Sequence, residues 1–171
     1  MNLVSKVLFG LVLAASAAHA QERQMLHDGW MIQSSAKAGA DGATISSSAY
    51  VPSEWYRATV PSTVVGTLVD DGVYPDPFFG MNFRSLPGVT YPIGANFVHT
   101  AMDPQSPYAV PWWYRTTFRV PAAMRGKRVT LAFDGINYRP HIGTNRHAPH
   151  DSTATTAPLR PSDHIVAEVD G

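Results

Sequence analysis

The stretch WWYRTTFRV at residues 112–120 is the part of the sequence that most limits what this chain can fold into. Its side chains alternate between two faces of an extended segment, with Trp112, Tyr114, Thr116, Phe118 and Val120 on one face and Trp113, Arg115, Thr117 and Arg119 on the other. Because the first set is largely apolar, we expect a strand that buries one side in an antiparallel sheet.

A second segment with the same alternation follows after a short turn. Pro121 ends the first strand, and the apolar residues of RVTLAFDG, at residues 128–135, again occupy every second position. We therefore predict that these two segments form an antiparallel hairpin with one buried side. Further strands are expected at residues 26–34, at residues 42–48 and from Ile136 onward.

One short helix is expected within residues 60–72. Ser62 or Thr63 can cap its N-terminus. Its apolar face consists of Val64, Val65, Leu68 and Val69, which follow helical spacing. Gly72 suits the left-handed conformation that often follows a last helical turn. Residues 73–111 are then expected to form a long ordered loop region, where binding sites are common.

The composition changes abruptly after Tyr138. Of the 18 aromatic residues, 17 lie between Trp30 and Tyr138, and none follows. Residues 139–171 instead contain four of the seven histidines, four prolines and the run STATTAP. Such a composition is typical of unpacked chain. We therefore expect a domain at residues 21–139 and an atypical tail at residues 140–171 that is disordered or read out of frame.

The first twenty residues have the pattern of an export signal. Lys6 precedes an apolar run at residues 7–18, and small residues occupy both positions read by a signal peptidase in Ala18-His19-Ala20. A run of twelve apolar residues is too short to span a bilayer. The sequence thus predicts cleavage after Ala20, a periplasmic or secreted protein, and no membrane partner.

Several classes of function conflict with the composition. The 13 basic and 13 acidic residues provide no basic stripe for a nucleic acid, and the absence of cysteine excludes a thiol nucleophile and a disulfide framework. The glutamates are Glu22, Glu54 and Glu168, and none has an apolar setting suited to acid–base chemistry. We expect no catalytic residue, no metal site and no cofactor in this chain.

Aromatic residues next to Asp and Asn suggest a sugar ligand, because rings stack on C–H faces while amides and carboxylates bind hydroxyls. Such residues are concentrated in GVYPDPFFGMN, at residues 72–82, and in PYAVPWWYR, at residues 107–115. The candidate substrate-binding residues are Asp76, Asn82, Asn96, Trp112 and Trp113. An alternative remains for each type of residue, since inward aromatics can be core and Asp or Asn can build turns.

Three ordered blocks carry a resemblance to a known family: residues 53–82, PWWYRTTFRVP at 111–121, and GKRVTLAFDGINYR at 126–139. Together they closely resemble the N-terminal sugar-binding domain of glycoside hydrolase family 2, in its exo-β-D-glucosaminidase and β-mannosidase branch. The resemblance implies an all-β, jelly-roll-like (galactose-binding-like) sandwich. In that family the sandwich packs on an immunoglobulin-like domain and on a (β/α)₈ barrel that carries both catalytic glutamates.

The sequence departs from this family after residue 139, where PHIGTNRHAPHD replaces a strand of the type I-W-L-N-G. The sandwich is therefore expected to be incomplete, and the family's catalytic glutamates have no counterpart. TYPIGANF, at residues 90–97, is similar to a segment that reaches the sugar subsite in the β-galactosidase branch, which places Asn96 at the matching position. The resemblance also implies a sugar-binding role for Asp76 and Asn82, on the less direct basis of the block PDPFFGMN.

The resemblance implies a non-catalytic sugar-binding domain of a secreted retaining glycoside hydrolase of carbohydrate degradation. Its ligand would be a non-reducing-end β-glycoside, and in the intact enzyme the domain would pack on its own barrel. The chain alone is expected to be inactive. Two alternatives are a free-standing secreted carbohydrate-binding module and a structural β-sandwich that binds no ligand.

Overall fold

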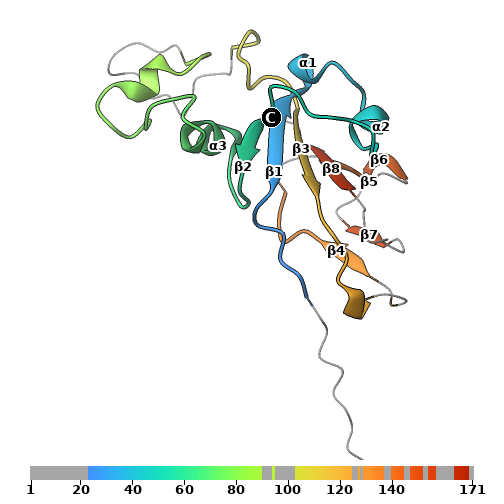
Figure 1. Ribbon diagram of the computed structural model, residues 1–171. Coiled ribbons are helices and arrows are strands. Elements are labelled where there is room, and N and C mark those ends of the chain that lie inside the picture. Colours follow the sequence, from blue (N-terminus) through green and yellow to red (C-terminus); the bar gives the residue numbers. More distant parts are fainter. Residues whose placement is uncertain are drawn as a thin grey trace, which may run out of the picture.

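The computed structural model describes residues 23–89, 94, 103–124, 127, 129–136, 140–144, 147–151, 154–156 and 164–169 (Figure 1). The strands are β1 (Trp30–Ser34), β2 (Tyr56–Ala58), β3 (Trp112–Thr117), β4 (Thr130–Ala132), β5 (Pro140–Thr144), β6 (His147–Asp151), β7 (Ala154–Thr156) and β8 (His164–Val169). The helices are α1 (Ser35–Ala38), α2 (Gly42–Ile45), α3 (Val64–Asp70), and the 3₁₀ turns η1 (Asn82–Ser85) and η3 (Ala122–Met124).

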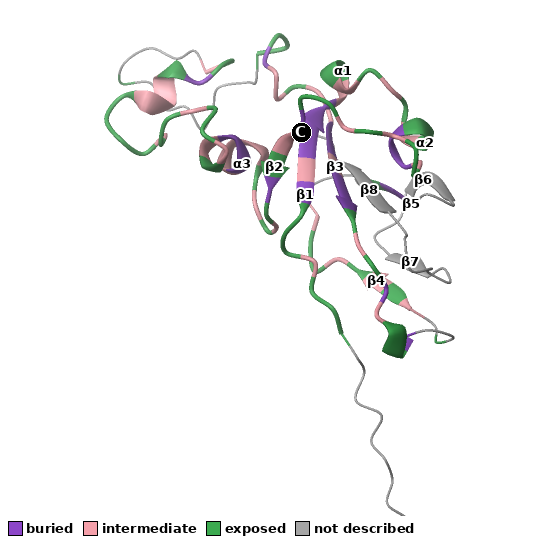
Figure 2. Ribbon diagram, in the orientation of Figure 1, coloured by how far each residue is buried: buried purple, intermediate pink, exposed green. Residues whose placement is uncertain are grey.

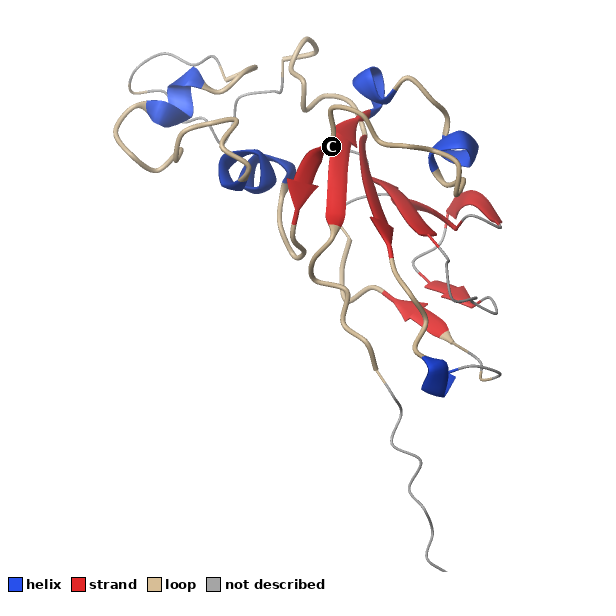
Figure 3. Cartoon of the chain, viewed as in Figure 1, coloured by secondary structure: helices blue, strands red, loops and turns tan. Residues whose placement is uncertain are grey.

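Two antiparallel sheets make up the fold. The larger sheet has six strands in the order β2-β1-β3-β8-β5-β6, and the smaller pairs β4 with β7. Figure 3 shows the helices at the margins of the sheets rather than between their strands. The fold is all-β, as the family resemblance implied, and residues 112–117 form the strand that the alternating pattern predicted.

Strand β3 is buried on both faces (Figure 2). On one face Trp112 belongs to a cluster with Trp30, Ile32, Ala58 and Leu68, and on the other Trp113 packs with Ile45 and Trp55. The prediction of a strand with one buried side is therefore wrong. The second face is covered by residues 45–55, a segment whose position no local pattern indicates.

Arg115 lies on this second face, and its buried side chain donates hydrogen bonds to backbone carbonyls through Nε and Nη2. The residue is 7% exposed. Its Nε donates to the carbonyl of Ile45 at 3.1 Å, and its Nη2 donates to the carbonyls of Ser47 and Tyr50 at 3.5 and 3.4 Å. The guanidinium carbon also lies 5.9 Å from the centre of the Tyr50 ring. Burial lowers the pKa of Arg115, and these contacts offset part of the cost of removing its charge from water.

The expected hairpin between residues 112–120 and 128–135 does not form. Strand β3 pairs with β1, which sets Ile32 opposite Tyr114, and with β8, whereas β4 pairs with β7. Strand β1 and the segment of β4 both have alternating side chains that suit pairing with β3. Alternation alone therefore could not show which of them lies next to β3.

The expected strand at residues 42–48 is also wrong, because this segment begins with the helix α2. The Asp41 carboxylate accepts a hydrogen bond from the backbone N–H of Thr44 at 2.8 Å, which caps the helix and lowers the pKa of Asp41. Ile45, at the end of α2, is fully buried. The cap at Asp41 thus makes the start of this segment helical, although residues 42–48 show a weak strand pattern.

Three other local predictions are confirmed. Strand β1 forms within the predicted residues 26–34, and its Trp30 and Ile32 are 6% and 0% exposed. Helix α3 starts after Thr63, whose hydroxyl accepts from the N–H of Gly66 at 3.0 Å. Gly72 has a φ of 75°, the left-handed conformation predicted for the residue after the helix.

The tail contributes to the sheet, contrary to the expectation that residues 140–171 lie outside the fold. Strand β8 pairs with both β3 and β5, and in β5 Ile142 and Thr144 are 0% and 2% exposed. Backbone pairing does not require aromatic side chains, so their loss after Tyr138 did not mark the end of the fold. The strand expected from Ile136 does not begin there: Ile136 is not in a strand, residues 137–139 lie outside the described ranges, and β5 begins at Pro140.

The predicted export signal at residues 1–20 also lies outside the described residues. Among the helices that are described, none is long and apolar enough to cross a membrane.

Replacing Arg115 by methionine should lower the free energy of unfolding by about 2–4 kcal/mol, because three backbone carbonyls lose their donor. Urea unfolding followed by tryptophan fluorescence measures the change. The matched control is Arg57→Met, since the Arg57 side chain is 89% exposed and its 3.4 Å ion pair with Asp71 is worth at most about 1 kcal/mol. Equal losses in the two variants would contradict a central role for Arg115.

Candidate functional site

Asp76 and Asn82 are brought together in the loop that follows α3. The backbone carbonyl of Asp76 accepts from the Asn82 side-chain amide at 2.9 Å, and the Asp76 carboxylate accepts from the N–H of Phe78 at 2.9 Å. The N–H of Phe79 lies 3.2 Å from the same carbonyl. Both predicted site residues therefore build the turn, and the short spacing PDPFFGMN made this local structure accessible from the sequence.

The turn presents large apolar side chains to solvent. Phe78, Phe79 and Met81 are 96%, 76% and 62% exposed. We call residues 75–86 the aromatic loop; it extends away from α3 and the edge of the sheet (Figure 1). Exposed apolar side chains on one braced loop form a contact surface for another molecule or another part of the same protein.

The two tryptophans predicted to bind substrate, Trp112 and Trp113, are core residues on opposite faces of β3. Trp112 is 5% exposed, its indole N–H donates to the carbonyl of Pro107 at 3.1 Å, and its ring stacks on Tyr108. Trp113 is 4% exposed and packs with Ile45. The structure therefore does not place them beside Asp76 and Asn82. Asn96, the remaining predicted residue, lies outside the described residues.

A cleft of about 290 Å³ lies where α1, β2 and the segment before β3 meet, and Trp112 is one of its lining residues. Tyr56 and Tyr74 add two further rings, while Lys37 and Gln105 add polar groups. These side chains are far apart in the sequence and share no motif. No sequence signal available here could have grouped them.

Two tyrosines near the cleft have raised pKa values. Burial, and after it the neighbouring Tyr74, raises the pKa of Tyr108, whereas burial alone raises the pKa of Tyr114. The Tyr108 hydroxyl is buried beside Tyr74. Both groups remain neutral at ordinary pH.

The described residues offer no arrangement suited to hydrolytic chemistry. They contain no cluster of three or more His, Asp or Glu side chains that could hold a metal ion. Glu54 is exposed in a connection, and the Asp71 carboxylate is paired with Arg57.

Comparison with known proteins gives a consistent set of relatives, although no family model matches the chain. It is 35% identical over 108 residues to an exo-β-D-glucosaminidase of Streptomyces avermitilis, covering 63% of the chain and 10% of that protein. It is 31% identical over 117 residues to an exo-β-D-glucosaminidase of Amycolatopsis orientalis, covering 68% of the chain and 9% of that protein. A mannosylglycoprotein endo-β-mannosidase of Lilium longiflorum is 26% identical over 128 residues, covering 73% of the chain and 12% of that protein.

Solved structures agree with these relatives. The crystal structure of an exo-chitosanase of Amycolatopsis orientalis superposes with a TM-score of 0.62 at 26% identity, covering 84% of this chain and 16% of that one. A β-D-mannosidase of Dictyoglomus thermophilum, with a TM-score of 0.51 at 19% identity, shares the fold over 83% of this chain and 15% of its own. The chain thus spans about a tenth of the length of the first two relatives.

Replacing Asn82 by alanine should loosen the aromatic loop, because the carbonyl of Asp76 loses its side-chain donor. We expect the amide of Phe78 to exchange with solvent roughly tenfold faster, with a change in global stability of at most about 1 kcal/mol. Hydrogen exchange measured by NMR tests this. Met81→Ala is the control, since Met81 is exposed; loosening of the loop in that variant as well would contradict the role assigned to Asn82.

Proposed function

This chain is a relative of the N-terminal domain of glycoside hydrolase family 2 enzymes, in the exo-β-D-glucosaminidase and β-mannosidase branch, and from this relationship we propose that it is the non-catalytic, sugar-binding domain of an exported carbohydrate-degrading enzyme. The observation that carries the proposal is the similarity to exo-β-D-glucosaminidases over 63–68% of the chain, in agreement with the fold. Activity, substrate and partner of the whole enzyme are part of the proposal.

A non-catalytic role fits the groups that the domain displays. A retaining glycosidase needs two carboxyl groups about 5–5.5 Å apart, one of them with a raised pKa. Glu54 is solvent-exposed, and the Asp71 carboxylate is engaged by Arg57. The catalytic glutamates of the enzyme would lie on its barrel, as the family resemblance implies.

The aromatic loop is the part of this domain that would reach the sugar. Its turn is braced by the contact between Asp76 and Asn82, so its exposed rings are held in place rather than collapsed onto the sheet. Phe78 and Phe79 offer flat apolar faces, which suit the C–H face of a pyranose. We assign to this loop one side of the pocket for the non-reducing-end sugar, packed against the catalytic barrel.

Two measurements test this proposal. Purified residues 21–171 should hydrolyse neither 4-nitrophenyl β-D-glucosaminide nor the corresponding β-D-mannoside, because in the described part of the chain Glu54 is exposed and Asp71 is paired with Arg57, and neither is prepared for the reaction. When this chain replaces the N-terminal domain of the Amycolatopsis orientalis exo-β-D-glucosaminidase, hydrolysis of the glucosaminide should be retained. Phe78→Ala in that chimera should then lower kcat/KM roughly three- to tenfold.

Arg57→Met is the control in the chimera, because Arg57 is exposed on β2 and outside the aromatic loop. Hydrolysis by the isolated chain would refute the non-catalytic role. A chimera whose kcat/KM is the same with and without Phe78 would refute the role of the loop and leave the non-catalytic role intact.

Export is tested separately. Expressed with residues 1–171 in a Gram-negative bacterial host, the protein should be recovered from the periplasm or medium with Gln21 as its first residue, as mass spectrometry would show. Ala18→Glu should block cleavage because a signal peptidase requires a small residue at this position, whereas His19→Gln should have no effect. Cytoplasmic protein that retains residues 1–20 would contradict the prediction.

A further inference from the structure

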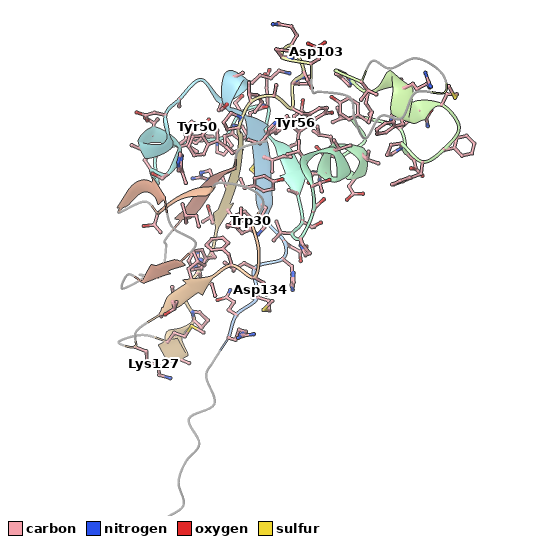
Figure 4. The ribbon with its side chains drawn as sticks, turned by 180° about the vertical axis from the view of Figure 1, so that it is seen from behind. Trp30, Tyr50, Tyr56, Asp103, Lys127 and Asp134 are labelled. Atoms are coloured by element: carbon pink, nitrogen blue, oxygen red, sulfur yellow. The ribbon has the colours of Figure 1, made fainter. Side chains whose placement is uncertain are left out.

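The cleft described above combines apolar and polar walls. Tyr56 of β2 and Tyr74, which follows α3, supply rings to its lining, and residues 104–107 with Val110 supply the rest of the wall that comes from the segment before β3. In Figure 4 Tyr56 lies beneath the segment whose outer end carries Asp103. The walls come from four separate parts of the chain, and the backbone N–H of Ser35 fixes α1 to the carbonyl of Pro111 at 2.9 Å.

The polar side chains that line the cleft are either positively charged or neutral. Lys37 contributes an ammonium group and Gln105 an amide, and no carboxylate is among the described lining residues. The described residues give Lys37 no ion pair. A ligand with a cationic group would therefore meet repulsion, whereas hydroxyl or carboxylate groups would find donors.

Tyr108 lies behind two of the residues that line the cleft. Its hydroxyl is buried beside Tyr74, which lines the cleft. The Tyr108 ring stacks on Trp112, another lining residue, at 6.4 Å between centroids and an angle of 22°. Tyr108 therefore supports Trp112, whose side chain lines the cleft.

We propose that this cleft binds one pyranose ring of a neutral or acidic sugar. A volume of about 290 Å³ suits a single ring better than an oligosaccharide. The rings of Tyr56 and Tyr74 face the C–H groups of the sugar, Gln105 binds a hydroxyl, and Lys37 binds a hydroxyl or a uronic-acid carboxylate. The site goes beyond the proposed function, because it needs neither a catalytic domain nor the aromatic loop.

The experiment is a calorimetric titration of purified residues 21–171 with three methyl β-D-pyranosides: the glucoside, the glucuronide and the 2-amino-2-deoxyglucoside. The first two should bind saturably with roughly millimolar Kd, and the amino sugar at least about tenfold more weakly. Lys37→Met should weaken binding of the glucuronide about tenfold and that of the glucoside less. Gln105→Ala should weaken both.

Lys127→Met is the matched control, because Lys127 is exposed and lies at the opposite end of the molecule from Tyr56 (Figure 4). Lys37 and Gln105 are exposed as well, and circular dichroism will verify that the variants keep their fold. Absence of saturable binding, equal or tighter binding of the amino sugar, or affinities unchanged in both cleft variants would overturn the proposal. Phe78→Ala should leave these affinities unchanged, so this site and the aromatic loop can fail independently.

Discussion

An arginine buried against a sheet must keep its charge and its donors satisfied, since an unpaired buried cation costs several kcal/mol. Arg115 meets this requirement through the carbonyls of Ile45, Ser47 and Tyr50. These contacts fix the segment after α2 over the second face of β3, where Trp113 completes a small apolar cluster with Ile45. Strand β3 therefore packs against one apolar cluster on each face. On the Arg115 face, the segment after α2 is held by buried hydrogen bonds as well as by apolar packing.

The position of β3 also decides where the two candidate binding features lie. The segment that leads into β3 ends at Pro111, whose carbonyl receives the N–H of Ser35, so α1 is held next to residues 104–110 and a cleft forms between them. The aromatic loop leaves α3, which contacts β2 at the edge of the same sheet. One rigid sheet thus positions both a recessed site and a projecting loop.

These two features suit different kinds of recognition. The aromatic loop is braced by its own hydrogen bonds and exposes its rings almost completely, which is appropriate for closing against a larger surface. The cleft is recessed, carries Lys37 and lacks a carboxylate among its described lining residues. Under the proposed function, the loop contacts the substrate of the enzyme, whereas the cleft holds a separate neutral or acidic sugar unit.

The sequence by itself determined the features that depend on neighbours a few residues away: the strand at residues 112–117, the cap at Thr63, the left-handed Gly72 and the turn that joins Asp76 to Asn82. Periodicity, capping and side-chain turns act within one element, so each can be recognised locally. Only the tertiary structure decided which strands flank β3, that its Arg115 face is covered, that strands from the tail complete the sheet, and that distant residues form one cleft. Alternation fixes which face a residue occupies but not which strand lies next to it, because strand pairing depends on contacts between distant parts of the chain.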